Sequence, residues 1–119
     1  MSSGQGRAQI VLAADIGGSR ARLLLARATA GGWRALRRHE TASPAHASIE
    51  ALIASFLGGA REKPLAACIA VAGPLENGRV CMTNLPWVVD GERLGARLGF
   101  SRVRLINDFA AQAHGLARI

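Results

Sequence analysis

A chain of 119 residues with a net charge of +7 is long enough for one domain and short for two. Half of its residues are hydrophobic and 19% are charged, which is typical of a globular protein rather than a disordered or fibrous one. No run of 18 apolar residues occurs, and the first apolar run is interrupted at Asp15, so we expect no membrane partner, no secretion signal and a cytoplasmic location.

Arginine supplies nearly all of the positive charge, because Lys63 is the single lysine. The arginines are spread along the sequence, and only Arg37 and Arg38 are adjacent. A scattered distribution without interleaved aromatic residues is typical of a solvated basic surface rather than of a nucleic-acid-binding patch. We therefore expect no nucleic-acid partner.

The two cysteines, Cys68 and Cys81, each lie within an apolar, strand-like run and match no zinc-binding spacing. Cysteines of this kind usually behave as small hydrophobic residues in a reducing compartment. We expect both side chains to be buried.

The first third of the chain predicts a β-hairpin extended by a third strand. Residues 1–8 are rich in Ser and Gly, and we expect a flexible tail there. The hairpin turn contains Gly17 and Gly18, at which we expect positive φ angles. The third strand has loosely alternating apolar and charged residues, as on an edge strand. The three predicted strands cover residues 9–16, 21–28 and 33–41.

The rest of the chain predicts helices that alternate with strands. A helix begins near Ser48 and ends near Leu57, where apolar residues recur at helical spacing and two glycines follow. The nearly continuous apolar run 65–72 is typical of a strand buried on both faces. Asp90 and Gly99 are the expected N-cap and C-terminal stop of a second helix. Further elements are expected at 79–83 (strand), 91–98 (helix), 103–106 (strand) and 109–117 (helix).

The resulting order is β-β-β-α-β-(β)-α-β-α. An antiparallel hairpin sheet extended by βαβ units is the plan of ribonuclease-H-like and actin-like ATPase domains. We therefore predict an α/β fold of this class with a mixed sheet.

Three segments contain residue types that suit a binding site. The first is Asp15-Ile16-Gly17-Gly18-Ser19, whose glycines would let backbone N–H groups approach a phosphate, although any hairpin turn could use the same glycines. The carboxylate of Asp15, at the end of a buried strand, would need a partner such as hydrated Mg²⁺.

The second segment is Asn107-Asp108, at the end of a strand, where ligands commonly bind in α/β sheets. Asp108 could accept a proton from an alcohol, or it could simply cap the last helix. The third segment contains Thr83, Asn84 and Trp87, which would suit either the lip of a sugar pocket or an ordinary turn with a packed tryptophan.

Three longer segments resemble the bacterial glucokinase family of the hexokinase and actin-like ATPase superfamily. They read LAADIGGSRARL at 12–23, ACIAVAGPLENGRVCMTN at 67–84 and GFSRVRLINDFA at 99–110. The resemblance spans residues 10–117. It implies transfer of the γ-phosphate of ATP to the 6-hydroxyl of glucose, with Mg²⁺, at the entry to glycolysis.

The resemblance also implies roles for single residues. Asp108 would be the catalytic base and a sugar ligand, and Asn107 would bind the sugar as well. Thr83 and Asn84 would lie near the sugar. Asp15 would hold Mg²⁺ through a water molecule. The ATP phosphates would be lined by Ala14, Asp15, Ile16, Gly17, Gly18 and Ser19.

The chain departs from the family pattern in two respects. Arg20 stands where the family usually has asparagine, and it would either add charge near the phosphates or point outward. Family members are also much longer, so residues 9–119 are expected to form the small N-terminal domain, truncated before a large C-terminal domain. We expect the missing domain to be a partner, the chain alone to lack kinase activity, and an exposed apolar face to permit self-association.

Two alternatives remain open. A ribonuclease-H-like nucleic-acid enzyme or binding module would share the strand order and could use Asp15 and Glu50 in a two-metal site, although the run 65–72 ends without a carboxylate to complete it. A different sugar kinase, or a sugar-responsive regulator, could be built on the same scaffold.

Overall fold

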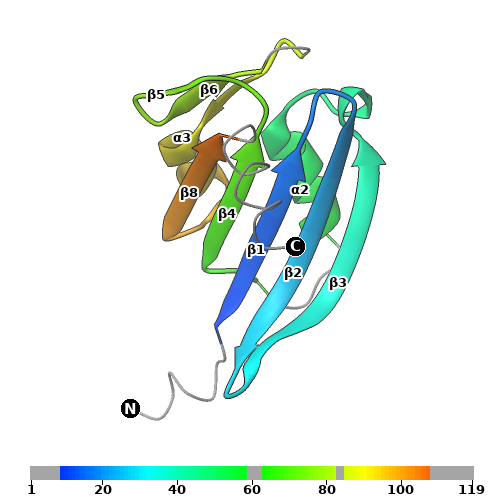
Figure 1. Ribbon diagram of the computed structural model, residues 1–119, viewed down its shortest axis with the longest axis vertical. Coiled ribbons are helices and arrows are strands. Elements are labelled where there is room, and N and C mark those ends of the chain that lie inside the picture. The colour runs from blue at the N-terminus through cyan, green and yellow to red at the C-terminus, as the bar shows by residue number, and fades with distance from the viewer. Residues whose placement is uncertain (1–8, 59–62, 83–84, 108–119) are drawn as a thin grey trace, which may run out of the picture.

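The computed structural model describes residues 9–58, 63–82 and 85–107. Its main feature is a five-stranded sheet in the order β3-β2-β1-β4-β8 (Figure 1). The strands are β1 (Ile10–Ile16), β2 (Arg20–Thr29), β3 (Gly32–Ala42), β4 (Ala66–Val71) and β8 (Arg102–Asn107). As predicted, β3 lies at an edge, and nearly all of its residues are exposed.

The sheet is mixed, because β1, β2 and β3 are antiparallel neighbours whereas β4 and β8 run parallel to β1. The register places Ile16, Val71 and Asn107 side by side at the carboxyl ends of β1, β4 and β8. Three strands therefore end together, so the segments that follow them start at one edge of the sheet.

Two helices, α2 (Ile49–Leu57) and α3 (Gly91–Leu98), lie behind the sheet in the view of Figure 1. Helix α2 buries five apolar side chains in the same core as the inward residues of β1, β2 and β4. Helix α3 packs directly on β8: a Cβ on Gly91 would lie 3.6 Å from Leu105, an ordinary van der Waals distance. Both helices therefore cover the same face of the sheet.

The helix ends agree with the prediction in most details. The side chain of Ser48 accepts from the backbone N–H of Ala51, and Asp90 accepts from those of Glu92 and Arg93. Gly99 ends α3 with a left-handed φ of 80°. Gly58, in contrast, has a right-handed φ of −59°, so α2 does not end in a left-handed glycine at this position.

A second sheet of three short strands was predicted only in part. It consists of β5 (Leu75–Glu76), β6 (Arg79–Cys81) and β7 (Val88–Asp90) in the order β5-β6-β7. A single strand was expected at 79–83, because segments of two or three residues are too short to show an alternating pattern. In Figure 1 this hairpin lies beyond the carboxyl ends of β4 and β8.

The prediction that the strand at 65–72 is buried on both faces is correct only in part. In β4 the side chains of Ala67, Ile69 and Val71 face the helices and are buried, whereas on the opposite face Ala70 is 9% exposed and Cys68 is exposed. No described helix covers that opposite face. We refer to it as the open face; its central residues are Ala13 on β1, Leu24 on β2, and Cys68 and Ala70 on β4.

The expected burial of both cysteines is therefore wrong. Cys68 lies on the open face, and Cys81 points away from the core because β6 buries only its middle residue, Val80. Apolar atoms also form much of the surface of a folded protein, so the composition of these runs did not distinguish a buried strand face from an exposed one.

Described elements otherwise match the predicted α/β order with a mixed sheet. The helix expected at 109–117 and the tail expected at 1–8 lie outside the described residues.

Candidate functional site

The carboxyl edge of β1, β4 and β8 brings together two of the predicted binding segments. The turn after β1 contains residues 17–19, and Asn107 is the last residue of β8. The segment that follows β4 is joined to β1 by a hydrogen bond from the N–H of Ala72 to the carbonyl of Ile16, 3.2 Å long. In parallel sheets this edge is the usual place for ligands, because loops converge there.

The turn after β1 is closed by a hydrogen bond of 2.9 Å from the N–H of Gly17 to the carbonyl oxygen of Arg20. A Cβ on Gly17 would lie 3.1 Å from that same oxygen, so a side chain would press on the turn. Neither Gly17 nor Gly18 has a positive φ, and the expected left-handed turn is wrong. Glycine suits position 17 because the carbonyl oxygen of Arg20 lies close to it, and not because of an unusual φ angle.

Ser43, which no motif in the sequence had indicated, lies directly beneath this turn. Its hydroxyl donates to the carbonyl of Gly17 at 2.7 Å, and its N–H donates to the carbonyl of Ser19 at 3.0 Å. Ser43 lies in the short 3-10 turn η1 (Ser43–Ala45) that follows β3. A serine at the end of an edge strand gives no local sign of a partner 26 residues earlier.

The side chains of the proposed phosphate segment point in different directions. Ala14 and Ile16 are buried in the core, so only their backbone could line a site. Asp15 is exposed, and the expectation of a buried carboxylate is wrong because alternate residues of β1 face the open side. Asp15 lies opposite Arg22 on β2 and lines a hollow of about 720 Å³.

Arg20 belongs to the surface of the sheet. Its Nε donates to a carboxylate oxygen of Glu40 on β3 at 2.5 Å, and its side chain is 68% exposed. This ion pair holds the pKa of Glu40 below its ordinary value, mainly through the hydrogen bond and the charge of Arg20. The guanidinium is thus directed across the strands toward β3.

Asn107 is held by the segment that follows β4. Its side-chain amide donates to the carbonyl oxygen of Gly73. Gly73 has a φ of 149°, and a Cβ there would lie 2.5 Å from the carbonyl oxygen of Cys81. Only glycine fits between Asn107 and the β6 strand. Gly73 directly follows the predicted strand at 65–72, and no motif in the sequence indicated this role.

The remaining predicted site residues, Asp108, Thr83 and Asn84, lie outside the described residues. Trp87, which was predicted in the same segment as Thr83 and Asn84, is 5% exposed and belongs to the core. Its carbonyl oxygen accepts from the N–H of Met82 at 3.1 Å, which joins β6 to β7 across this segment. Of the two interpretations of this segment, the burial of Trp87 agrees with an ordinary turn that has a packed tryptophan.

Comparison with known proteins identifies the family to which this arrangement belongs. A family model described as Glucokinase matches residues 12–119. A curated glucokinase from Nostoc punctiforme is 34% identical over 110 residues, which is 91% of this chain and 32% of that protein. The chain belongs to the glucokinase family.

Solved structures of glucokinases share the fold. The crystal structure of a glucokinase from an Antarctic psychrotroph superposes with a TM-score of 0.79 at 34% identity, covering 87% of this chain and 33% of that one. A ROK family glucokinase from Streptomyces griseus, solved in complex with glucose and AMPPNP, has a TM-score of 0.62 at 24% identity and covers 83% of this chain and 33% of that one. The fold is therefore that of the sugar-kinase relatives, as predicted, and the chain spans about a third of their length.

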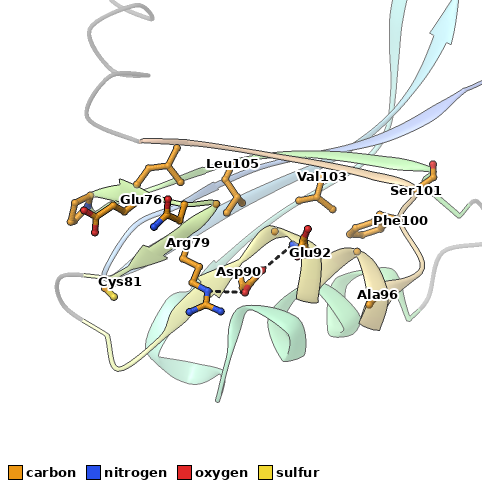
Figure 2. Close-up of a pocket in the computed structure, with 16 residues that line it drawn as sticks. Glu76, Arg79, Cys81, Asp90, Glu92, Ala96, Phe100, Ser101, Val103 and Leu105 are labelled. Atoms are coloured by element: carbon orange, nitrogen blue, oxygen red, sulfur yellow. Dashed lines mark hydrogen bonds and ion pairs between the residues drawn. The ribbon is translucent and has the colours of Figure 1, made fainter.

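A larger hollow of about 950 Å³ is lined in part by residues of the 67–84 and 99–110 segments (Figure 2). It lies between β8, α3 and the β5–β6 hairpin, and Arg79 and Asp90 are paired at 3.0 Å on one wall. None of the described residues predicted to bind ligand lines it. We therefore assign the candidate site to the carboxyl edge of the sheet rather than to this hollow.

Within the described part of this glucokinase-family chain, no three metal-ligating side chains of His, Cys, Asp or Glu cluster together. The two carboxylates of the two-metal alternative are not brought together: Asp15 lies on the open face, whereas Glu50 lies on α2 at the opposite face and pairs with Arg93 on α3 at 3.8 Å. Among residues 9–58, 63–82 and 85–107 there is also no helix long and apolar enough to cross a membrane.

Proposed function

We propose that the protein to which these residues belong phosphorylates glucose at its 6-hydroxyl with ATP. Membership of the glucokinase family supports the reaction type. The structural observation that supports it best is the shared carboxyl edge, where the 17–19 turn and Asn107 lie on strands separated only by β4. Phosphoryl transfer requires the nucleotide phosphate and the sugar hydroxyl to be held next to each other, and segments that converge at one edge can do this.

The proposed roles follow this arrangement. The backbone of residues 14–19 lines the phosphates, and Asn107 hydrogen-bonds the sugar, with Thr83 and Asn84 nearby. The 6-hydroxyl oxygen attacks the γ-phosphorus, its proton passes to the carboxylate of Asp108, and ADP leaves. Phosphoryl transfer needs little more than positioning and charge stabilisation once one proton acceptor is in place.

Mg²⁺ would be held mainly by the nucleotide phosphates. The exposed carboxylate of Asp15 suits an outer contact through water, because it is a hard oxygen donor at the end of β1. A fully protein-built cage does not fit the described residues, which contain no cluster of three ligands. When bound, the ion would neutralise charge on the transferred phosphoryl group.

A coupled assay of ATP-dependent glucose 6-phosphate formation tests the proposal. In a glucokinase of family length that contains these residues, Asp108→Asn should lower kcat by about 100-fold or more, because the base is lost. Asp90→Asn, a carboxylate-to-amide change at a helix cap, should leave kcat nearly unchanged. Normal turnover by the Asp108 variant would show that Asp108 is not the catalytic base. Preference for another hexose would show that glucose is not the substrate.

The 119-residue chain provides a second arm of this assay. It spans about a third of the length of its relatives, and we expect no measurable turnover from it alone. Turnover comparable to that of a full-length relative would contradict the proposal that the remaining groups of both pockets lie outside these residues.

A further inference from the structure

We propose that Ser43 is a positioning residue for phosphate binding: it orients the Gly17–Gly18 peptide so that the Gly18 N–H faces the nucleotide. The inference rests on the proposed function of the 17–19 turn. It gives the end of β3 a part in the site, although none of the predicted site residues lies there. Figure 1 shows the end of β3 beside the turn that joins β1 to β2.

Ser43 is completely buried. It is 0% exposed and is the one buried polar residue among those that the structure describes. Burying a hydroxyl costs free energy unless it is hydrogen-bonded, so we expect the hydroxyl of Ser43 to keep a hydrogen-bond partner in the folded protein. That partner is the carbonyl oxygen of Gly17, 2.7 Å away.

Ser43 also holds the turn on both sides of Gly18. Its hydroxyl binds the carbonyl of Gly17, and its N–H binds the carbonyl of Ser19 at 3.0 Å. The C=O and N–H groups of a trans peptide point in opposite directions. Because the Gly17 carbonyl points toward buried Ser43, the Gly18 N–H points toward the outer side of the turn, where a phosphate could approach.

Ser43 is itself held in place by its neighbours. Its carbonyl oxygen accepts from the N–H of His46 at 3.1 Å, and Pro44 occupies the first turn of η1. The side chains of Thr41 and His46 are hydrogen-bonded at 3.1 Å across the same turn. A donor fixed in this way presets the phosphate-binding conformation before the nucleotide arrives, which lowers the cost of binding.

The experiment follows the backbone amide signals of the ¹⁵N-labelled chain while MgATP, or Mg²⁺ with tripolyphosphate, is added to millimolar concentration. In the native chain, we expect the Gly18 amide signal to shift on addition of either probe. In Ser43→Ala, we expect affinity to fall about tenfold, as the loss of one orienting hydrogen bond implies. Ser43→Cys, which is nearly isosteric and has a weak donor, should lie between the two.

Ser101→Ala is the matched control. The hydroxyl of Ser101 also donates to a backbone carbonyl, that of Leu65, at 2.9 Å, but it lies at the opposite end of β8 from the site. We expect this variant to bind both probes as the native chain does. Equal loss of affinity in both alanine variants would show a general effect of stability and would overturn the inference.

The remaining outcomes separate the inference from the proposed function. Native affinity in Ser43→Ala, with the Gly18 signal still shifting, would overturn the role of Ser43 and leave the phosphate turn in place. A Gly18 signal that neither probe shifts, in the native chain or in a glucokinase of family length that contains these residues, would overturn both. If Ser43→Ala does not fold, Ser43→Cys decides: unchanged affinity would overturn the inference, and reduced affinity would support it.

Discussion

Gly73 is a position at which the structure cannot accommodate a side chain. Its φ is 149°, and a Cβ at this position would lie only 2.5 Å from the Cys81 carbonyl oxygen, which leaves no room for a side chain. We expect Gly73→Ala to lower the free energy of unfolding by about 3 kcal/mol, since strain at this φ adds to overpacking. Urea unfolding measures the change.

Gly78 provides the control for that substitution. Its φ is 76°, but a Cβ there would meet nothing within 4 Å. Gly78→Ala should therefore cost only about 1 kcal/mol, the penalty of a left-handed alanine. Equal losses at the two glycines would show that contact with Cys81 does not matter and that φ alone decides.

The side chain of Asp90 makes the stability of the protein depend on pH. The hydrogen bond from the backbone N–H of Arg93, and to a lesser extent the contacts with Arg79 and Glu92, hold its pKa below the ordinary value of 3.8. A carboxylate whose pKa is lowered by folding stabilises the native state above its unfolded pKa, and this contribution is lost as pH falls through the folded pKa.

We therefore expect stability to decline with acidification below about pH 4 more steeply in the native chain than in Asp90→Asn. The asparagine retains a capping acceptor but does not titrate. Urea midpoints measured from about pH 5 to about pH 3 test this. Parallel decline in the two proteins would mean that other carboxylates, such as Glu40 beside Arg20, dominate the effect.

At the scale of elements, β4 separates the two faces of the sheet most clearly. Ile69 is 0% exposed against the helices, whereas its neighbour Cys68 is on the open face. We expect Ile69→Ala to cost about 3 kcal/mol and Cys68→Ala less than about 0.5 kcal/mol in the free energy of unfolding. A large loss at Cys68 would show that the open face is packed in solution.

The elements themselves were predictable to the extent that their signals are local. Ser48, Asp90 and Gly99 mark helix ends through contacts within a few residues, and all three were identified from the sequence. The exposure of Cys68 was not, because it depends on which face of the finished sheet the helices cover. Likewise β5 and β7 depend on pairing with β6 rather than on their own composition.

The candidate site was predictable in the same partial way. Glycines and polar residues after strands indicated the 17–19 turn and Asn107, and the register places their strands at one edge. Ser43 and Gly73 were missed because each acts on a partner distant in sequence: 26 residues separate Ser43 from Gly17, and 34 separate Gly73 from Asn107.

At the scale of the whole molecule, the reactivity of Cys68 measures whether the open face is covered, and Cys81 on the second sheet provides a comparison. Both are exposed, on different sheets, so we expect both thiols of the native 119-residue chain to react with a thiol reagent without denaturant. Single-cysteine variants assign the two rates. Protection of Cys68 alone would contradict an uncovered face, and protection that increases with protein concentration would identify a second copy as the cover.

The edge strand β3 has a further consequence for the behaviour of the chain in concentrated solution. It pairs with β2 on one side, and no described strand pairs with its other side, so eleven residues of backbone are available as a template for cross-β growth. Three arginines, Arg34, Arg37 and Arg38, lie along this strand. We expect charge repulsion between these arginines on neighbouring copies to oppose such pairing, and to oppose it less as the ionic strength rises.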